Sequence, residues 1–181
     1  MKITLLSLMI CLNPAVLEVD GVSLETSLNS ENRSLKLAGA SGFTYALLFD
    51  VLSGGIYLPP EVPASQFSIA KDKALVLAYK RNFSATELRE VTTNLFTRNN
   101  PESLVTQFKT ELSQFNALYQ DIKPGDRYQL TLVSNRGIEL SLNGKRVGQI
   151  ENPEFGAAVF NIWFGEKPFS ASFRDGLLKG I

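Results

Sequence analysis

The chain has 181 residues, a length typical of one domain that buries its own core without disulfide or metal support. Its 18 basic and 18 acidic side chains give a net charge of zero, which excludes the basic surface that nucleic-acid binding needs. The sequence has no histidine and a single cysteine, Cys11, so Ser-His-Asp and Cys-His catalysis, histidine-ligated metals and an internal disulfide are excluded. What remains is carboxylate, lysine or tyrosine chemistry, or binding without chemistry.

The first residues have the pattern of a secretory signal. Lys2 precedes an apolar run from Ile3 to Leu12, and the turn-forming pair Asn13-Pro14 ends this run. A membrane span needs about 20 apolar residues, so the run is too short to be one. We expect residues 1–15 to be removed on export and residues 16–181 to form one domain, periplasmic or secreted, without a membrane span. The alternative for this segment is a first β-strand of the domain.

Strand patterns dominate the next part of the chain. Short strands are predicted at 16–19 and 35–38, on either side of a polar stretch, and a buried strand at 74–79. Residues 43–58 are apolar almost throughout, which predicts one long central strand covered on both faces. Two adjacent glycines at 54–55 predict a bulge or a bend within it.

Two helix starts follow in the middle of the chain. Ser84 and Glu87 have the spacing of a capping box, and the helix after them places an apolar face at Leu88, Val91, Thr92 and Leu95. Asn100-Pro101 predict a second start, with Asn as the cap and Pro in the first turn. The stripe of this second helix is Leu104, Phe108, Leu112 and Phe115.

After residue 126 the apolar period changes to two. Residues 128–132 and 138–142 alternate between apolar and polar side chains, and Asn143-Gly144 predict a hairpin turn. Asn152-Pro153 begin another helix, whose apolar stripe is Phe155, Val159 and Ile162, and a last short helix is expected over 170–179. Strands with helices segregated to one side indicate an α+β fold.

The order of several short motifs resembles the chalcone isomerase-like family, in its secreted bacterial branch. The motifs are Phe-Asp-Val at 49–51 with Gly-Ile-Tyr-Leu-Pro at 55–59, Phe-Ser-Ala at 83–85 with Leu-Arg-Glu at 88–90, Phe-Asn-Ala-Leu at 115–118 with Ile-Lys-Pro-Gly-Asp at 122–126, Leu-Ser-Leu-Asn-Gly-Lys at 140–145, and Ile-Trp-Phe-Gly-Glu-Lys-Pro at 162–168. The resemblance implies an open-faced β-sandwich, in which a large antiparallel sheet carries a helical layer on one face and a cleft opens between them.

The resemblance also implies where a ligand would bind, and it argues against catalysis. Chalcone isomerases close a bicyclic flavonoid from an open precursor with an Arg, a Thr, a Tyr, an Asn and a Ser/Thr around the cleft. The matching positions here, in that order, are Thr44, Leu52, Phe83, Glu90 and Gly156, and none keeps the family residue. In the family, the Arg cation holds the phenolate of the substrate and the Tyr hydroxyl donates to the enolate. Thr44 and Phe83 supply neither group here. The same Arg anchors carboxylates in fatty-acid-binding members, so Thr44 leaves only a neutral hydrogen bond there.

The expected ligand-binding positions are therefore these five and Tyr57, which belongs to the matched Tyr-Leu pair. Glu87 and Glu90 have the spacing of an acid/base pair, but a solvated helix face with Glu87 as a cap is favoured. Asp50 within an apolar strand favours a local ion pair over a pocket role, and Lys80-Arg81 is the alternative anion clamp. Core positions are favoured over cleft positions for the aromatic residues Tyr45, Tyr57, Tyr79 and Trp163.

Three functions follow from these patterns. The first is a non-catalytic protein that binds a small apolar ligand, a fatty acid or similar, between sheet and helices. The second is an intramolecular lyase or isomerase of another substrate, acting through residues such as Tyr45 or Glu90, and the third is a structural envelope protein. No P-loop, dinucleotide fingerprint, GxSxG or EF-hand pattern occurs in the sequence, so no cofactor, metal site or nucleic-acid partner is predicted. The oligomeric state stays open.

Overall fold

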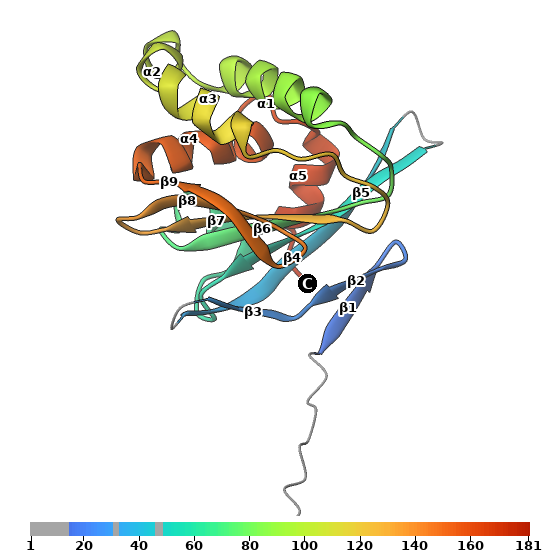
Figure 1. Cartoon of the computed structure of the whole chain (residues 1–181). Coiled ribbons are helices and arrows are strands. Elements are labelled where there is room, and N and C mark those ends of the chain that lie inside the picture. The colour runs from blue at the N-terminus through green and yellow to red at the C-terminus, as the bar shows by residue number, and fades with distance from the viewer. Residues whose placement is uncertain (1–14, 31–32, 46–48) are drawn as a thin grey trace, which may run out of the picture.

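A long antiparallel sheet forms the centre of the molecule (Figure 1). The computed structural model describes residues 15–30, 33–45 and 49–181, and the predicted signal at 1–15 falls almost wholly outside them. Within the described residues the large sheet has seven strands whose spatial order follows the chain: β3 (Ser27–Ser30), β4 (Arg33–Tyr45), β5 (Phe49–Leu58), β6 (Lys73–Tyr79), β7 (Arg127–Val133), β8 (Gly137–Leu142) and β9 (Lys145–Ile150).

The helices lie on one face of this curled sheet, and a small hairpin lies on the other (Figure 1). The hairpin pairs β1 (Val16–Val19) with β2 (Val22–Glu25). The helices are the 3-10 helix η1 (Ala64–Ile69), α1 (Ala85–Asn99), α2 (Glu102–Gln107), α3 (Lys109–Ala117), α4 (Pro153–Phe164) and α5 (Ala171–Leu178). This arrangement confirms the predicted α+β class and the open-faced sandwich with a helical layer on one face.

Two hydrophobic cores occupy the two faces of the large sheet. Along β5, Leu52, Ile56 and Leu58 pack into the core under the helices, whereas Tyr57 packs into the smaller core under the hairpin. Strand β6 divides in the same way, because Leu75 and Leu77 belong to the first core and Ala74 and Val76 to the second. Both central strands are therefore covered on both faces, which accounts for their largely apolar sequences.

The apolar run 43–58 is not one strand, as its composition predicted. It contains the end of β4 and all of β5, which pair antiparallel with Phe43 opposite Leu52, and residues 46–48 between them lie outside the described part. The segment contains Ala46, Leu47 and Leu48 rather than turn residues, so the sequence carries no turn signal. Gly54 and Gly55 also lack the predicted bulge: they pair in register with Ser41 and Ala40, and the register shifts lie elsewhere in β4.

The remaining local predictions depend on helix caps. Ser84 caps α1 with its complete capping box, and Asn152 and Ser170 cap α4 and α5 through their side-chain oxygens. Asn100 was wrong as an N-cap, because it ends α1 and its buried amide donates to the carbonyls of Phe96 and Ala158. The expected second helix is divided at Phe108 into α2 and α3.

The predicted meander is confirmed as β7, β8 and β9. Strand β8 pairs with both neighbours, and its turn to β9 contains Asn143 and Gly144 at φ values of 52° and 77°. Positive φ at both central residues is the requirement of the tight hairpin turn that Asn-Gly favours.

Candidate functional site

A cavity of about 700 Å³ lies between the sheet and the helices. Strands β4, β5 and β6 form one wall, and α1 and α4 form the other, with the segments after α3 and after α4 at the ends. Its volume falls within the range of about 300–1,000 Å³ that ligand pockets occupy. The lining residues are Phe43, Tyr45, Val51, Leu52, Leu77, Tyr79, Arg81, Asn82, Phe83, Glu87, Leu88, Val91, Thr92, Leu95, Tyr119, Ile162, Trp163 and Phe169.

The charged groups of this cavity lie at its mouth and the apolar groups in its interior. Arg81 and Glu87 are both exposed, as are Tyr45 at 65% and Val91 at 48%. The buried part of the lining is formed by Leu52, Leu77, Tyr79, Leu88, Thr92, Leu95, Tyr119, Ile162 and Trp163. An apolar interior with polar groups at the opening favours a ligand whose surface is largely hydrocarbon.

Three hydroxyl groups interrupt the apolar interior. Thr92 Oγ1 donates to Tyr119 Oη at 3.0 Å, and the Tyr79 and Tyr119 rings both pack edge-on against Tyr128. Burial raises the pKa of Tyr79 and of Tyr119 far above the usual range, so both phenols stay protonated. Their O–H groups therefore act as hydrogen-bond donors rather than as bases.

The local sequence explains why α1 faces the cavity. The Ser84 hydroxyl accepts from the Glu87 amide, and the Glu87 carboxylate accepts from the Ser84 amide at 2.7 Å, which lowers the pKa of Glu87. Phe83 and Ile122 exchange two backbone hydrogen bonds, 3.1 and 2.9 Å long, just before this cap. The helix start is thus fixed to the segment between α3 and β7, and Thr92 is turned inward with its apolar neighbours on the same face.

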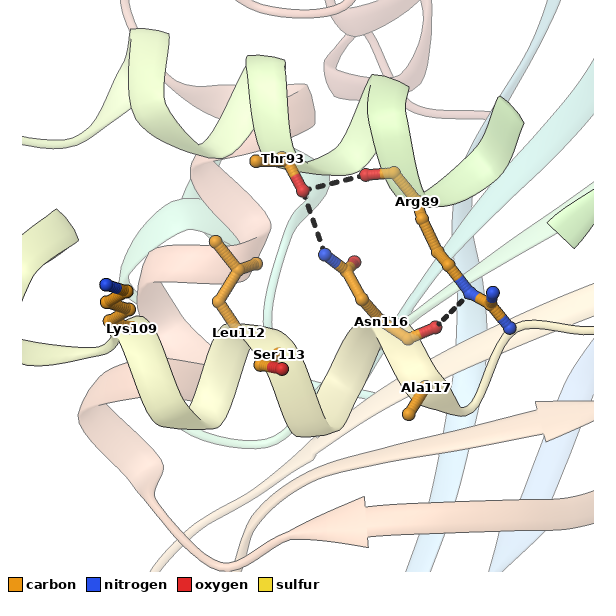
Figure 2. Close-up of a pocket in the computed structure, with 7 residues that line it drawn as sticks. All are labelled: Arg89, Thr93, Lys109, Leu112, Ser113, Asn116 and Ala117. Atoms are coloured by element: carbon orange, nitrogen blue, oxygen red, sulfur yellow. Dashed lines mark hydrogen bonds between the residues drawn. The ribbon is translucent and has the colours of Figure 1, made fainter. Parts of the chain in front are cut away.

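A second hollow lies on the outer side of α1, between α1 and α3 (Figure 2). There Arg89 Nε donates to the Asn116 carbonyl at 3.0 Å, Asn116 Nδ2 donates to Thr93 Oγ1 at 2.8 Å, and Thr93 Oγ1 donates back to the Arg89 carbonyl at 2.8 Å. Arg89 Nη2 also reaches the Tyr119 carbonyl at 3.3 Å. This network joins α1 to the turn that carries Tyr119, so it positions two walls of the cavity.

Two of the six predicted site residues line the cavity, Leu52 on β5 and Phe83 at the entry to α1. Thr44 lies beside the mouth but is exposed, and its hydroxyl donates to Asp50 Oδ1 at 2.8 Å. Phe43 and Tyr45 line the cavity and Thr44 between them does not, because successive side chains of a strand point to opposite faces of the sheet. Asp50 also lies 3.8 Å from Lys80, which confirms the local ion pair.

The other three predicted site residues lie away from the cavity. Tyr57 is buried under the hairpin, where its hydroxyl donates to the Glu25 carbonyl at 2.9 Å. Glu90 is exposed on α1. Gly156 is buried in α4 against Leu132 and Ile138, and a Cβ there would lie 2.6 Å from Leu132 Cδ1.

Sequence reasoning missed Tyr119 as a site residue. Phe115 follows Leu112 by three residues and Tyr119 follows Phe115 by four, so Tyr119 continues the apolar stripe of the second predicted helix. This spacing was the signal that could have identified it. Tyr79 and Trp163, expected in the core, are buried and also form cavity wall.

The described part of the chain has neither a metal-binding cluster nor a membrane-spanning helix. No group of three or more His, Cys, Asp or Glu side chains in residues 15–30, 33–45 and 49–181 is placed to hold a metal ion. Among those residues, no helix combines the length and apolarity of a membrane span.

The fold and the cavity define an α+β open-faced sandwich with an internal apolar site. A chalcone isomerase-like family model matches residues 15–179, and the chain belongs to this family. Among solved structures, the chain is similar to a fatty-acid binding protein of Arabidopsis thaliana, with a TM-score of 0.62 and 16% identity over 87% of this chain and 92% of that one. A comparison with curated protein sequences gives no match.

Proposed function

We propose that this protein binds a small, largely apolar molecule, a fatty acid or a related fatty acyl compound, without transforming it. The observation that carries the proposal is the cavity of about 700 Å³ whose buried wall is hydrocarbon apart from three hydroxyls and the indole N–H of Trp163. Removal of apolar surface from water supplies about 25 cal/mol per Å², so the ligand needs no fixed charge for affinity. The similarity to a fatty-acid binding protein in fold supports the same class of ligand.

The lining supports binding rather than catalysis. The matched positions Leu52 and Phe83 place hydrocarbon where chalcone isomerases carry hydroxyls, and Thr44 directs its hydroxyl to Asp50 outside the cavity. The buried phenols stay protonated, so neither can take a proton at neutral pH.

We also propose that residues 1–15 are a secretory signal and that the domain acts in the periplasm or outside the cell. The family match from residue 15 onward supports this boundary. N-terminal sequencing of the protein from its native host tests it. A start near residue 16 is expected, and an intact Met1 on cytosolic protein would contradict the proposal.

The binding test uses N-phenyl-1-naphthylamine, a neutral dye whose fluorescence rises in apolar surroundings. We expect saturable binding of one dye per chain, equally tight at low and high salt, because no fixed charge holds it. Affinity that collapses with salt would instead indicate a cationic clamp, with Lys80 and Arg81 the first residues to substitute. Absence of dye binding would favour the structural role.

A pair of variants on α1 localises the dye. Val91 lines the mouth and is half exposed, so Val91→Glu places a charge there at little cost to folding. Loss of apolar contact worth about 1–2 kcal/mol is expected to weaken dye binding about 5- to 30-fold. Asn94 is exposed on the same helix and does not line the cavity, so Asn94→Glu is the matched control and keeps wild-type affinity. Equal effects of both variants would contradict the location.

A further inference from the structure

We infer that the cavity selects an uncharged carbonyl compound, an ester or amide of a fatty acid, whose carbonyl oxygen accepts hydrogen bonds from Tyr79 and Tyr119. This inference rests on the proposed function and adds the chemical class of the polar end of the ligand. Its basis is the set of hydroxyl groups inside the apolar interior and the hydrogen bonds that they already make.

The Tyr119 hydroxyl has a proton that the fold does not use. Thr92 Oγ1 donates to Tyr119 Oη at 3.0 Å, so the phenol oxygen is the acceptor in this bond. A phenol carries one donor in addition to its acceptor capacity, and within the described residues Tyr119 Oη donates to no other group. Both residues are buried, Thr92 at 6% and Tyr119 at 7% exposure.

The Tyr79 hydroxyl also makes no hydrogen bond to another described residue. The side chain is 8% exposed, and its ring is held by edge-on contacts with Phe83 and Tyr128, at centroid distances of 5.7 and 6.2 Å. Tyr128, by contrast, is fully engaged, because its oxygen accepts from the Gln120 amide and donates to the Gln120 carbonyl. Two phenol donors in one cavity wall thus remain for a ligand, and buried polar groups of this kind are normally paired.

The chemistry of these donors selects an acceptor without charge. Burial keeps both phenols protonated, so each offers an O–H group to an oxygen of the ligand and neither takes a proton from the ligand. An ionised carboxylate buried beside them would need a cation, because an unpaired charge in an apolar site is costly. Of the described lining residues, Arg81 carries a positive charge, and it is exposed at the mouth with its Nε on the Asp50 carbonyl at 3.1 Å.

The test is competition of methyl decanoate and of dodecane against bound N-phenyl-1-naphthylamine, in the full chain. Each of Tyr79→Phe and Tyr119→Phe removes one hydroxyl and keeps the ring. We expect each to weaken methyl decanoate about 3- to 10-fold more than dodecane, the effect of one neutral hydrogen bond. Tyr57→Phe is the matched control, since this buried phenol lies on the opposite face of the sheet, and it should change neither ligand.

The outcomes separate this inference from the function on which it rests. Dye binding with no loss of methyl decanoate affinity in either variant would overturn the inference and leave the binding function standing. Equal losses for methyl decanoate and dodecane would also overturn it, since they would report damaged packing. Failure of the wild type to bind the dye would overturn both.

A readout on the wild-type protein makes the test independent of variant folding. The infrared carbonyl stretch of methyl decanoate labelled with ¹³C at the carbonyl should move to lower frequency on binding, relative to the ester in dodecane. A band that stays at its dodecane frequency in the saturated complex would overturn the inference.

Discussion

Lys73 carries a buried charge whose effect on folding can be followed with pH. Its side chain is 3% exposed, and its Nζ donates to the carbonyls of Phe67 at 3.0 Å and Ser68 at 2.9 Å, at the end of η1. The rings of Phe67 and Phe160 flank the ammonium, with centroids 5.1 and 5.2 Å away. Burial nevertheless lowers the pKa of Lys73 to about 8 from its ordinary value of 10.5.

The sign of the pH effect follows from which state holds the proton. Between pH 8 and 10.5 the unfolded chain keeps a proton on Lys73 that the folded chain has released, so the free energy of unfolding rises with pH. At 1.36 kcal/mol per pKa unit, the difference between 10.5 and about 8 corresponds to about 3 kcal/mol. Below pH 8 both states are charged, and this destabilisation is present in full.

Urea unfolding of the wild type and of Lys73→Met between pH 7 and 11 measures this effect. Methionine has an unbranched side chain without a titrating group. Loss of the Lys73 hydrogen bonds therefore changes the free energy of unfolding of the variant by an amount that does not vary with pH. The tyrosines titrate in both proteins and cancel in the difference. The wild type should gain about 3 kcal/mol relative to the variant across the window. A difference that is flat, or that falls as pH rises, would refute the reasoning.

Three further predictions concern the frame of the cavity and its chemistry. Ser84→Ala removes the capping box of α1 and should lower the free energy of unfolding by about 1 kcal/mol in urea titrations, and an unchanged value would mean that the cap is redundant. Gly54→Ala places a Cβ 2.6 Å from Phe173 Cζ and 3.1 Å from the Val76 carbonyl, so calorimetry should show a loss of about 1–3 kcal/mol, whereas a gain would contradict the close packing. A chalcone mixed with the protein at neutral pH should lose absorbance no faster than the protein-free blank, because Leu52 and Phe83 bring no polar group to the cavity.

Features that depend on neighbouring residues could be predicted from the sequence. The capping box at Ser84, the Asn143-Gly144 turn and the cap at Asn152 each involve a few residues of one segment, and the structure confirms them. Asn100 shows the limit of such local reasoning. Its amide finds buried carbonyl partners in α1 and α4, and the second of these comes from a segment 58 residues away.

The face of each central strand could not be predicted in the same way. Tyr57 and Tyr79 both occur in apolar strands, yet Tyr57 packs under the hairpin and Tyr79 lines the cavity. Alternation reveals which side chains share a face only when one face is wet, and β5 and β6 are covered on both. In β4, Phe43 and Tyr45 line the cavity and Thr44 between them does not, and the structure was needed to show which of the two faces borders the cavity.

The cavity itself has no local signature, because a gap between apolar side chains requires the same residues as close packing. Its wall joins β4, β5, β6, α1, α4 and the turn after α3, and these elements are spread over most of the chain. Tyr119 and Thr92 meet there through a hydrogen bond over 27 residues. Periodicity identified the apolar faces of the helices, and the space between these faces and the sheet depends on how they pack.

Trp163 provides the most direct measurement of ligand binding in the cavity. It is the single tryptophan of the chain, it is 7% exposed, and its side chain lines the cavity. Bromine atoms quench tryptophan fluorescence at contact, so methyl 9,10-dibromostearate reports whether its acyl chain lies beside Trp163. Unbrominated methyl stearate is the matched control. The account predicts saturable quenching at one ester per chain with the brominated compound alone. Dye displacement by the brominated ester without quenching of Trp163 would contradict the account, because the ligand would then lie elsewhere.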